Sequence, residues 1–69
     1  MSVEKAIDLT ATGSTIEEAV GEAVHRASLT LTGLTSFEVT RIEGVITDGD
    51  IAYRVQVRVC FVIKEHVHE

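Results

Sequence analysis

Residues 51–63 have the sequence IAYRVQVRVCFVI. Every second side chain is apolar, from Ile51 to Ile63, and three of the six side chains between them are strongly polar. This alternation predicts one long antiparallel strand with an apolar face and a mostly polar face. The polar face presents Arg54, Gln56 and Arg58 in a row, and no other segment of the sequence is suited to cover it. Any binding function is therefore expected on this face.

One amphipathic helix is predicted from Thr15 to Leu31. Its apolar residues recur at helical spacing, and they are Ile16, Ala19, Val20, Ala23, Val24, Ala27 and Leu31. Ser14 followed by Glu17 is the pattern of a capping box, which satisfies the first backbone N–H groups of a helix. Gly33 is suited to act as the C-cap.

Two further strands are expected, one before and one after this helix in the sequence. Residues 3–10 form the first, followed by a turn at residues 11–14, and residues 36–47 form the second. In the second strand the apolar phase slips near Thr40 and Arg41, which predicts a β-bulge or a sharp bend. The Asp-Gly pair in residues 47–50 predicts a tight hairpin into the long strand.

The predicted fold class is α+β, with the order β-α-β-β in a single domain covering residues 1–69. The long strand is expected at the centre of a three-stranded antiparallel sheet, because it can then pair with both neighbours. The sheet is expected to curl around the helix, and residues 65–69 are expected to fray.

The size of the chain favours self-association. A domain of 69 residues has a thin core, and small domains usually depend on disulfides, a metal or oligomerisation. Cys60 is the only cysteine, which excludes an internal disulfide and argues against a structural zinc site. We therefore predict a homo-oligomer.

Charge and hydropathy argue against several partners. The formal net charge is −5 and the basic residues are scattered, which argues against nucleic acid. No apolar run reaches membrane-spanning length, and the N-terminus lacks the pattern of a secretory signal. A single free cysteine suits a reducing compartment, so a cytoplasmic location with no membrane partner is expected.

Catalytic chemistry has little support in the sequence, and no enzyme is predicted. Cys60 has no histidine near it in sequence, and a small half-buried residue is the expected role. His25 is expected on the helix surface. His66 and His68 point the same way on an extended chain and can chelate zinc or nickel, although a solvated tail is favoured. Residues 48–50 resemble a fragment of a calcium loop but lack its distal glutamate, so a hairpin turn is favoured.

The order and spacing of several short motifs resemble the dodecin family from about Lys5 to Lys64. They are Arg26-Ala27 in the helix, Ser36-Phe37-Glu38-Val39 at the start of the second strand, and Tyr53-Arg54-Val55 through Val59-Cys60-Phe61 in the third. The resemblance implies a hollow homododecamer in which the sheet wraps around the helix. It also implies a flavin storage or sequestration function, with flavins stacked in pairs at two-fold interfaces.

At two positions the sequence departs from typical dodecins. The family's flavin-stacking tryptophan is replaced by Ser36, and its glutamine that hydrogen-bonds the ring edge is replaced by Arg54. Stacking of the flavin ring on an aromatic side chain contributes roughly 0.5–1.5 kcal/mol to binding beyond area burial. Serine has no ring and does not supply this contribution. The Tyr-Arg pattern resembles a dodecin subgroup linked to calcium.

Three functions follow from the resemblance. The first is weak binding of riboflavin, FMN or FAD at Ser36 and Arg54, with Gln56 and Arg58 supporting the ligand from the same polar face. The second is binding of calcium or magnesium by clustered carboxylates at symmetry axes. The candidate carboxylates are Asp8, Glu38, Glu43, Asp48 and Asp50. The third is a structural shell without a dedicated ligand.

Overall fold

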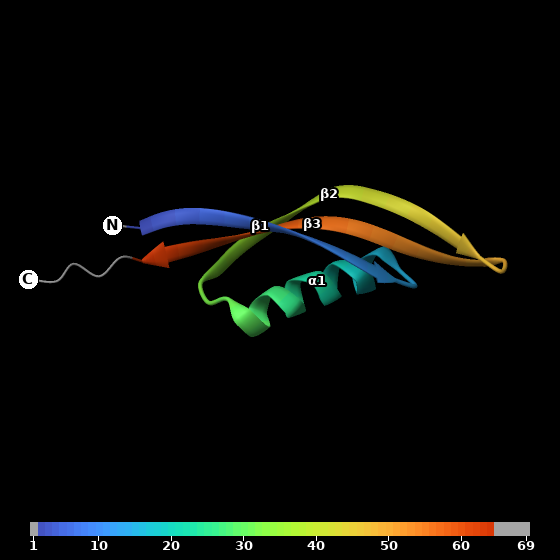
Figure 1. The fold of residues 1–69 in the computed structure, drawn as a ribbon, viewed down its shortest axis with the longest axis horizontal. Helices are drawn as coiled ribbons and strands as arrows, with labels where there is room; N and C mark the ends of the chain where they lie inside the picture. The colour runs from blue at the N-terminus through green and yellow to red at the C-terminus, as the bar shows by residue number, and fades with distance from the viewer. Residues whose placement is uncertain (1, 65–69) are drawn as a thin grey trace, which may run out of the picture.

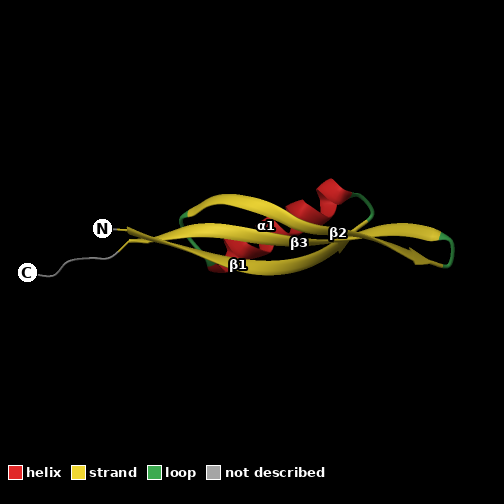
Figure 2. Ribbon diagram, turned by 90° about the horizontal axis from the view of Figure 1, so that it is seen from above, coloured by secondary structure: helices red, strands yellow, loops and turns green. Residues whose placement is uncertain are grey.

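The protein consists of one curved sheet with one helix on its concave side (Figure 1). The computed structural model describes residues 2–64. The element order confirms β-α-β-β. The bounds are β1 Ser2–Gly13, α1 Ile16–Thr30, β2 Leu34–Thr47 and β3 Asp50–Lys64. Figure 2 shows the three strands as a single layer with α1 behind it.

The sheet has the predicted order β1-β3-β2, with both pairs antiparallel. β3 is central because it is long enough to pair along its length with both neighbours. β2 and β3 are joined by a tight turn in which Asp48 has φ 52° and Gly49 φ 82°. Positive φ at both central residues is the requirement of a type I′ turn, so the hairpin prediction is confirmed.

The predicted bulge lies where the phase of β2 slips. The register to β3 shifts between Val39 and Arg41, and the hydroxyl of Thr40 donates to the carbonyl of Gln56 at 3.2 Å. Because one extra residue is inserted, apolar side chains before and after the bulge can point to the same side. Phe37 thus pairs with Val59, and Ile42 pairs with Val55.

The core is made of three alanines of α1 packed against valines of β3. Ala19, Ala23 and Ala27 are buried, and so are Val55, Val57, Val59 and Phe61. Methyl side chains on the helix let it approach the sheet closely. A Cβ at Gly13 would lie 2.8 Å from the backbone nitrogen of Ala19, so the junction of β1 and α1 requires glycine.

Three predicted boundaries are wrong by a few residues. Residues 11–13 continue β1 instead of forming a turn, because Thr10, Ala11, Thr12 and Gly13 all remain paired with β3. The N-cap is Thr15, which is extended with φ −132° and ψ 162°, so the capping pair is Thr15 and Glu18 instead of Ser14 and Glu17.

At its other end α1 stops before Gly33. The C-cap is Leu31, whose N–H donates to the carbonyl of Ala27 at 3.0 Å. Gly33 instead lies in the loop, where its carbonyl accepts from the N–H of Val62 at 3.0 Å. This bond fastens the loop to β3. Glycine is required here because its φ is 74° and a Cβ would lie 2.9 Å from the carbonyl oxygen of Val62.

The molecule is elongated. Its radius of gyration is 15.2 Å, whereas a compact domain of this size has about 11 Å. The β2–β3 hairpin extends beyond the N-terminal end of α1 (Figure 1), which leaves the apolar side chains of the hairpin exposed. Phe37 and Ile42 lie on the edge strand β2 beside the buried Val59 and Val55, and they are exposed as well. This apolar band consists of Phe37 (52% exposed), Ile42 (53%), Ile46 (76%) and Ile51 (59%).

Candidate functional site

The face of the sheet opposite α1 carries polar side chains from all three strands. Within residues 2–64 no helix covers it. The antiparallel register places each residue of β3 between a partner from β1 and a partner from β2. The resulting cross-strand rows are Ala6–Cys60–Ser36, Asp8–Arg58–Glu38, Thr10–Gln56–Arg41 and Thr12–Arg54–Glu43.

Arg58 lies between two carboxylates. Its Nε donates to Asp8 Oδ1 at 3.0 Å, and its Nη2 donates to Asp8 Oδ2 at 3.4 Å. The hydrogen bond from Arg58 to Asp8, together with the charge of Asp8 and more weakly that of Glu38, raises the pKa of Arg58. These two contacts fix the orientation of the Arg58 and Asp8 side chains relative to each other.

Glu43 holds two arginines. Arg54 Nε donates to Glu43 Oε1 and Arg41 Nη2 donates to Glu43 Oε2, both at 2.9 Å. The hydrogen bond from Arg54, followed by the positive charges of Arg41 and Arg54, lowers the pKa of Glu43. The carboxylate is therefore ionised at neutral pH and fixes the positions of both guanidinium groups.

A small polar pocket lies at this ion-pair network. Its volume is about 250 Å³, and it is lined by Thr10, Arg41, Glu43, Arg54, Val55 and Gln56. The lining combines two guanidinium groups, one carboxylate, one amide and one hydroxyl. These groups can bind a small polar or anionic ligand group by hydrogen bonds and charge.

Ser36 and Arg54 share the polar face but lie far apart in one protomer. Ser36 pairs with Cys60, which is six residues from Arg54 along β3. At about 3.3 Å per residue this separation is roughly 20 Å. A single ligand can therefore contact both positions only if they come from different protomers.

The predicted carboxylates are not gathered within one chain. Asp8 and Glu43 are paired with arginines, and Asp48 and Asp50 lie at the hairpin turn. No group of three or more metal-ligating side chains occurs among the described residues. A cation site would need carboxylates from more than one copy. His66 and His68 lie outside the described residues.

Two residues of the polar pocket did not emerge from the sequence. Thr10 was assigned to β1 without a role, and Arg41 was assigned only to the bulge. The alternation of β3 identified the central residues of each row, but their neighbours depend on the register. A pairing scheme for the strands that includes the bulge would have placed Arg41 beside Gln56.

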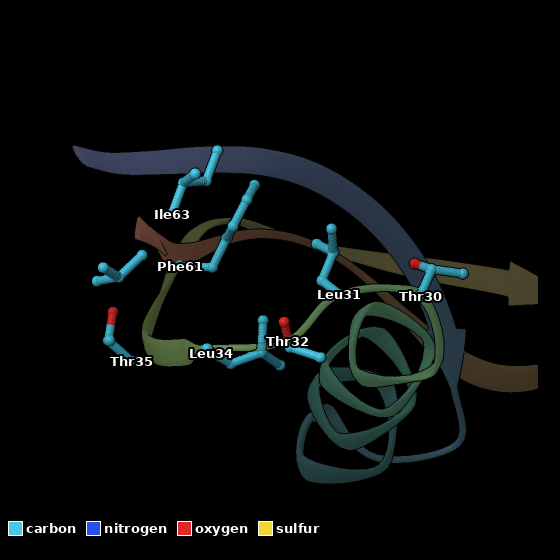
Figure 3. A pocket seen from close by; sticks show the side chains of 9 residues that line it. Thr30, Leu31, Thr32, Leu34, Thr35, Phe61 and Ile63 are labelled. Carbon is cyan, nitrogen blue, oxygen red and sulfur yellow. The ribbon is translucent and has the colours of Figure 1, made fainter. Parts of the chain in front are cut away.

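A second, larger groove lies at the other end of the helix. Its volume is about 760 Å³. Figure 3 shows its side chains, which come from the end of α1, the following loop and the C-terminal part of β3. Threonine hydroxyls and the apolar side chains of Leu31, Leu34, Phe61 and Ile63 line it. No charged side chain is among its lining residues, so we place the candidate site on the polar face.

Comparison with known proteins decides the family. The Dodecin family model matches residues 3–64. The chain belongs to the dodecin family. The dodecin of Streptomyces coelicolor is 33% identical, with a TM-score of 0.86 over 94% of this chain and 96% of that one. An arginine-to-alanine mutant of Thermus thermophilus dodecin is 34% identical, with a TM-score of 0.87 over 94% of this chain and 100% of that one.

A calcium-binding dodecin is also similar to this chain. The calcium-chelating immunodominant antigen calcium dodecin of Mycobacterium tuberculosis is 28% identical, with a TM-score of 0.80 over 97% of this chain and 99% of that one. No sequence among the curated proteins matches significantly. Dodecins bind small ligands without a known catalytic activity. No helix in the described part of this dodecin has the length and apolar character needed to span a membrane.

Proposed function

We propose that this dodecin binds a small ligand on the polar face of its sheet, in cavities formed between copies of a homododecamer in the cytoplasm. The observation that carries the proposal is the uncovered row of Arg54, Gln56 and Arg58, flanked by polar partners from both edge strands. The separation of about 20 Å between Ser36 and Arg54, from the strand rise, supports a cavity shared by two copies.

Flavin is the first candidate ligand, and we expect weak binding. Ser36 supplies no ring on which isoalloxazine can stack, so the attraction is limited to hydrogen bonds and burial. Arg54 can donate to the polar edge of the ring only if it rearranges relative to Glu43, to which it is bonded at 2.9 Å.

Quenching of riboflavin fluorescence tests this candidate. Ser36→Trp restores the platform and should strengthen binding at least several-fold. The double variant Ser36→Trp with Arg54→Gln restores both family positions and should bind more tightly still. The control is Leu29→Trp, which places an indole on the exposed surface of α1. If the double variant binds no better than the unmodified protein, the assignment of the flavin site is wrong.

Calcium is the second candidate. The similarity to the Mycobacterium tuberculosis calcium dodecin favours it, and the carboxylates of Asp8 and Glu38 flank Arg58 on the same face.

Isothermal titration calorimetry with calcium, repeated with magnesium, tests this hypothesis. Asp8→Asn and Glu38→Gln should each weaken calcium binding. Asp48→Asn at the hairpin turn separates a site there from one on the polar face. A titration without heat would exclude calcium and, with absent flavin quenching, would favour a structural shell.

A further inference from the structure

The polar pocket has an excess of positive charge although the whole protein is acidic. Arg41 and Arg54 contribute two positive charges and Glu43 one negative charge, while the formal net charge of the chain is −5. Arg41 and Glu43 lie on β2 and Arg54 on β3, next to the bulge. The adjacent row Asp8–Arg58–Glu38 adds one net negative charge to the same face, so the positive excess is confined to the pocket. An anion is therefore attracted by direct hydrogen bonds from the two guanidinium groups.

Most of the hydrogen-bond donors of the two arginines remain free for a ligand. A guanidinium has five N–H donors. Among the described residues, Arg41 donates one hydrogen bond and Arg54 donates one, both to Glu43. The side chains of Arg41 and Arg54 are 66% and 48% exposed, so their remaining donors are accessible. Gln56 and Thr10 add an amide and a hydroxyl to the lining.

Glu43 itself indicates what the pocket accepts. One carboxylate receives hydrogen bonds from both guanidinium groups through its two oxygens, each at 2.9 Å. Both arginines are thus held close enough together for one tetrahedral oxyanion to bridge them. A phosphate group offers more acceptor oxygens than a carboxylate and up to twice its charge, so it satisfies more of the free donors.

We propose that Arg41 and Arg54 bind a phosphate group in this pocket, and that Glu43 occupies the site as an internal competitor when no ligand is present. The inference deepens the proposed function, because it rests on the same polar face and assigns it a phosphorylated ligand. The phosphate is either free inorganic phosphate or that of a flavin mononucleotide, in which case Arg54 holds the phosphate and the polar edge of the ring lies elsewhere. Glu43 thereby sets the affinity: it keeps the arginines positioned, and phosphate must displace it.

The first experiment uses inorganic phosphate as the probe, at low ionic strength, with binding followed by the phosphorus NMR line width. Glu43→Gln removes the competing charge and should strengthen binding about two- to fivefold, the range expected for loss of an exposed ion pair. Arg54→Gln and Arg41→Gln should each weaken it, and Arg54→Lys should restore part of the loss by returning the charge without the fork.

The chain offers a matched control in the Glu22–Arg26 pair of α1. Arg26 Nε donates to Glu22 Oε2 at 3.0 Å, and Arg26 is 69% exposed. Its donor atom is the same as that of Arg54, and its exposure resembles that of Arg41. Glu22→Gln changes the net charge as Glu43→Gln does, but it should leave phosphate binding unchanged. If Glu22→Gln and Glu43→Gln strengthen binding equally, or if no variant binds inorganic phosphate and FMN binds no more tightly than riboflavin, the proposal is overturned.

The second experiment compares riboflavin with FMN, which differ by the phosphate group. If the phosphate belongs to a flavin, FMN binds more tightly than riboflavin, and Arg41→Gln abolishes the difference. Equal affinities combined with binding of inorganic phosphate support a site for free phosphate. If riboflavin and FMN bind equally and inorganic phosphate does not bind, the phosphate site is excluded while ligand binding on the polar face stands. Binding of inorganic phosphate without either flavin supports the site and contradicts flavin as the ligand.

Discussion

At the scale of single residues, Glu43 differs from the other carboxylates of the sheet because two guanidinium groups hydrogen-bond to it. Exposed ion pairs contribute little to stability, typically 0–1 kcal/mol. Glu43 is only 34% exposed, however, and its two bonds fix the directions of Arg41 and Arg54. Its main contribution is therefore to order the polar face, and its effect on stability is expected to be small and to depend on pH.

The lowered pKa of Glu43 predicts the sign of this dependence. Because the folded-state pKa lies below the ordinary value of 4.5, the ionised form stabilises the folded protein above that value. The stabilisation is lost as the pH falls through the lowered folded-state pKa. Urea unfolding should show Glu43→Gln to be less stable than the unmodified protein at pH 7, with the difference shrinking below pH 4.5. A difference that persists unchanged at pH 2 would contradict the assignment.

Thr15 is predicted to stabilise the start of α1. Its side chain accepts from the N–H of Glu18 at 3.0 Å, while the N–H and hydroxyl of Ser14 donate to Glu18 Oε1 at 3.1 and 3.0 Å. Loss of an N-cap costs about 0.5–2 kcal/mol. Thr15→Ala should lower the free energy of unfolding by this amount, whereas Thr15→Ser keeps the hydroxyl and should cost little. Equal losses in the two variants would show that the cap is not the cause.

At the scale of elements, the β2–β3 hairpin depends on the left-handed conformation of Gly49, at φ 82°. Side chains destabilise this conformation by roughly 1–2 kcal/mol, so Gly49→Ala should lower the thermal midpoint although a Cβ there meets nothing within 4 Å. Gly21 is the matched control, since its Cβ also meets nothing. Because Gly21 lies inside α1, Gly21→Ala should stabilise the protein by about 0.5–1 kcal/mol. Destabilisation by both variants would contradict this argument.

The elements were predictable where a periodic pattern ran over many residues. The alternation of β3 and the helical spacing of the alanines are consequences of which side chains must meet in the core. Boundaries were less predictable. Nothing in the local pattern shows that Ala11 and Thr12 stay paired to Val55 and Arg54, because that pairing depends on how far β3 extends.

The contacts within the candidate site were not predictable from the sequence, although several of its residues were named. Arg54 and Arg58 followed from alternation within one strand, whereas their partners Glu43 and Asp8 follow from the register between strands. Arg41 joins the site because of the bulge, whose position the phase slip indicated without giving its geometry. The separation of Ser36 from Arg54 likewise requires the register, so the sequence could not show that they need separate protomers.

At the scale of the whole molecule, the protomer has a core too thin for its length. Seven apolar side chains are buried among the described residues, and three of them are alanines. Meanwhile the four side chains of the apolar band are each more than half exposed. Several exposed apolar side chains on one side of the same strand pair mark an interaction surface. The family's homododecameric members supply the natural partner, another copy of the same chain.

The assembly prediction follows from this surface. Native mass spectrometry should give a particle of about 90 kDa, which is twelve chains of 7.5 kDa. Ile42→Lys and Ile46→Lys each place a positive charge in the apolar band. Burial of the band between copies would then leave an ammonium group unpaired, so each variant should shift the particle towards smaller species. Leu29→Lys is the control, because Leu29 is also exposed, at 64%, but lies on α1 outside the band. A folded monomer of the unmodified protein at micromolar concentration would refute the assembly and any cavity between copies. The phosphate pocket would remain, because all of its lining residues come from one chain.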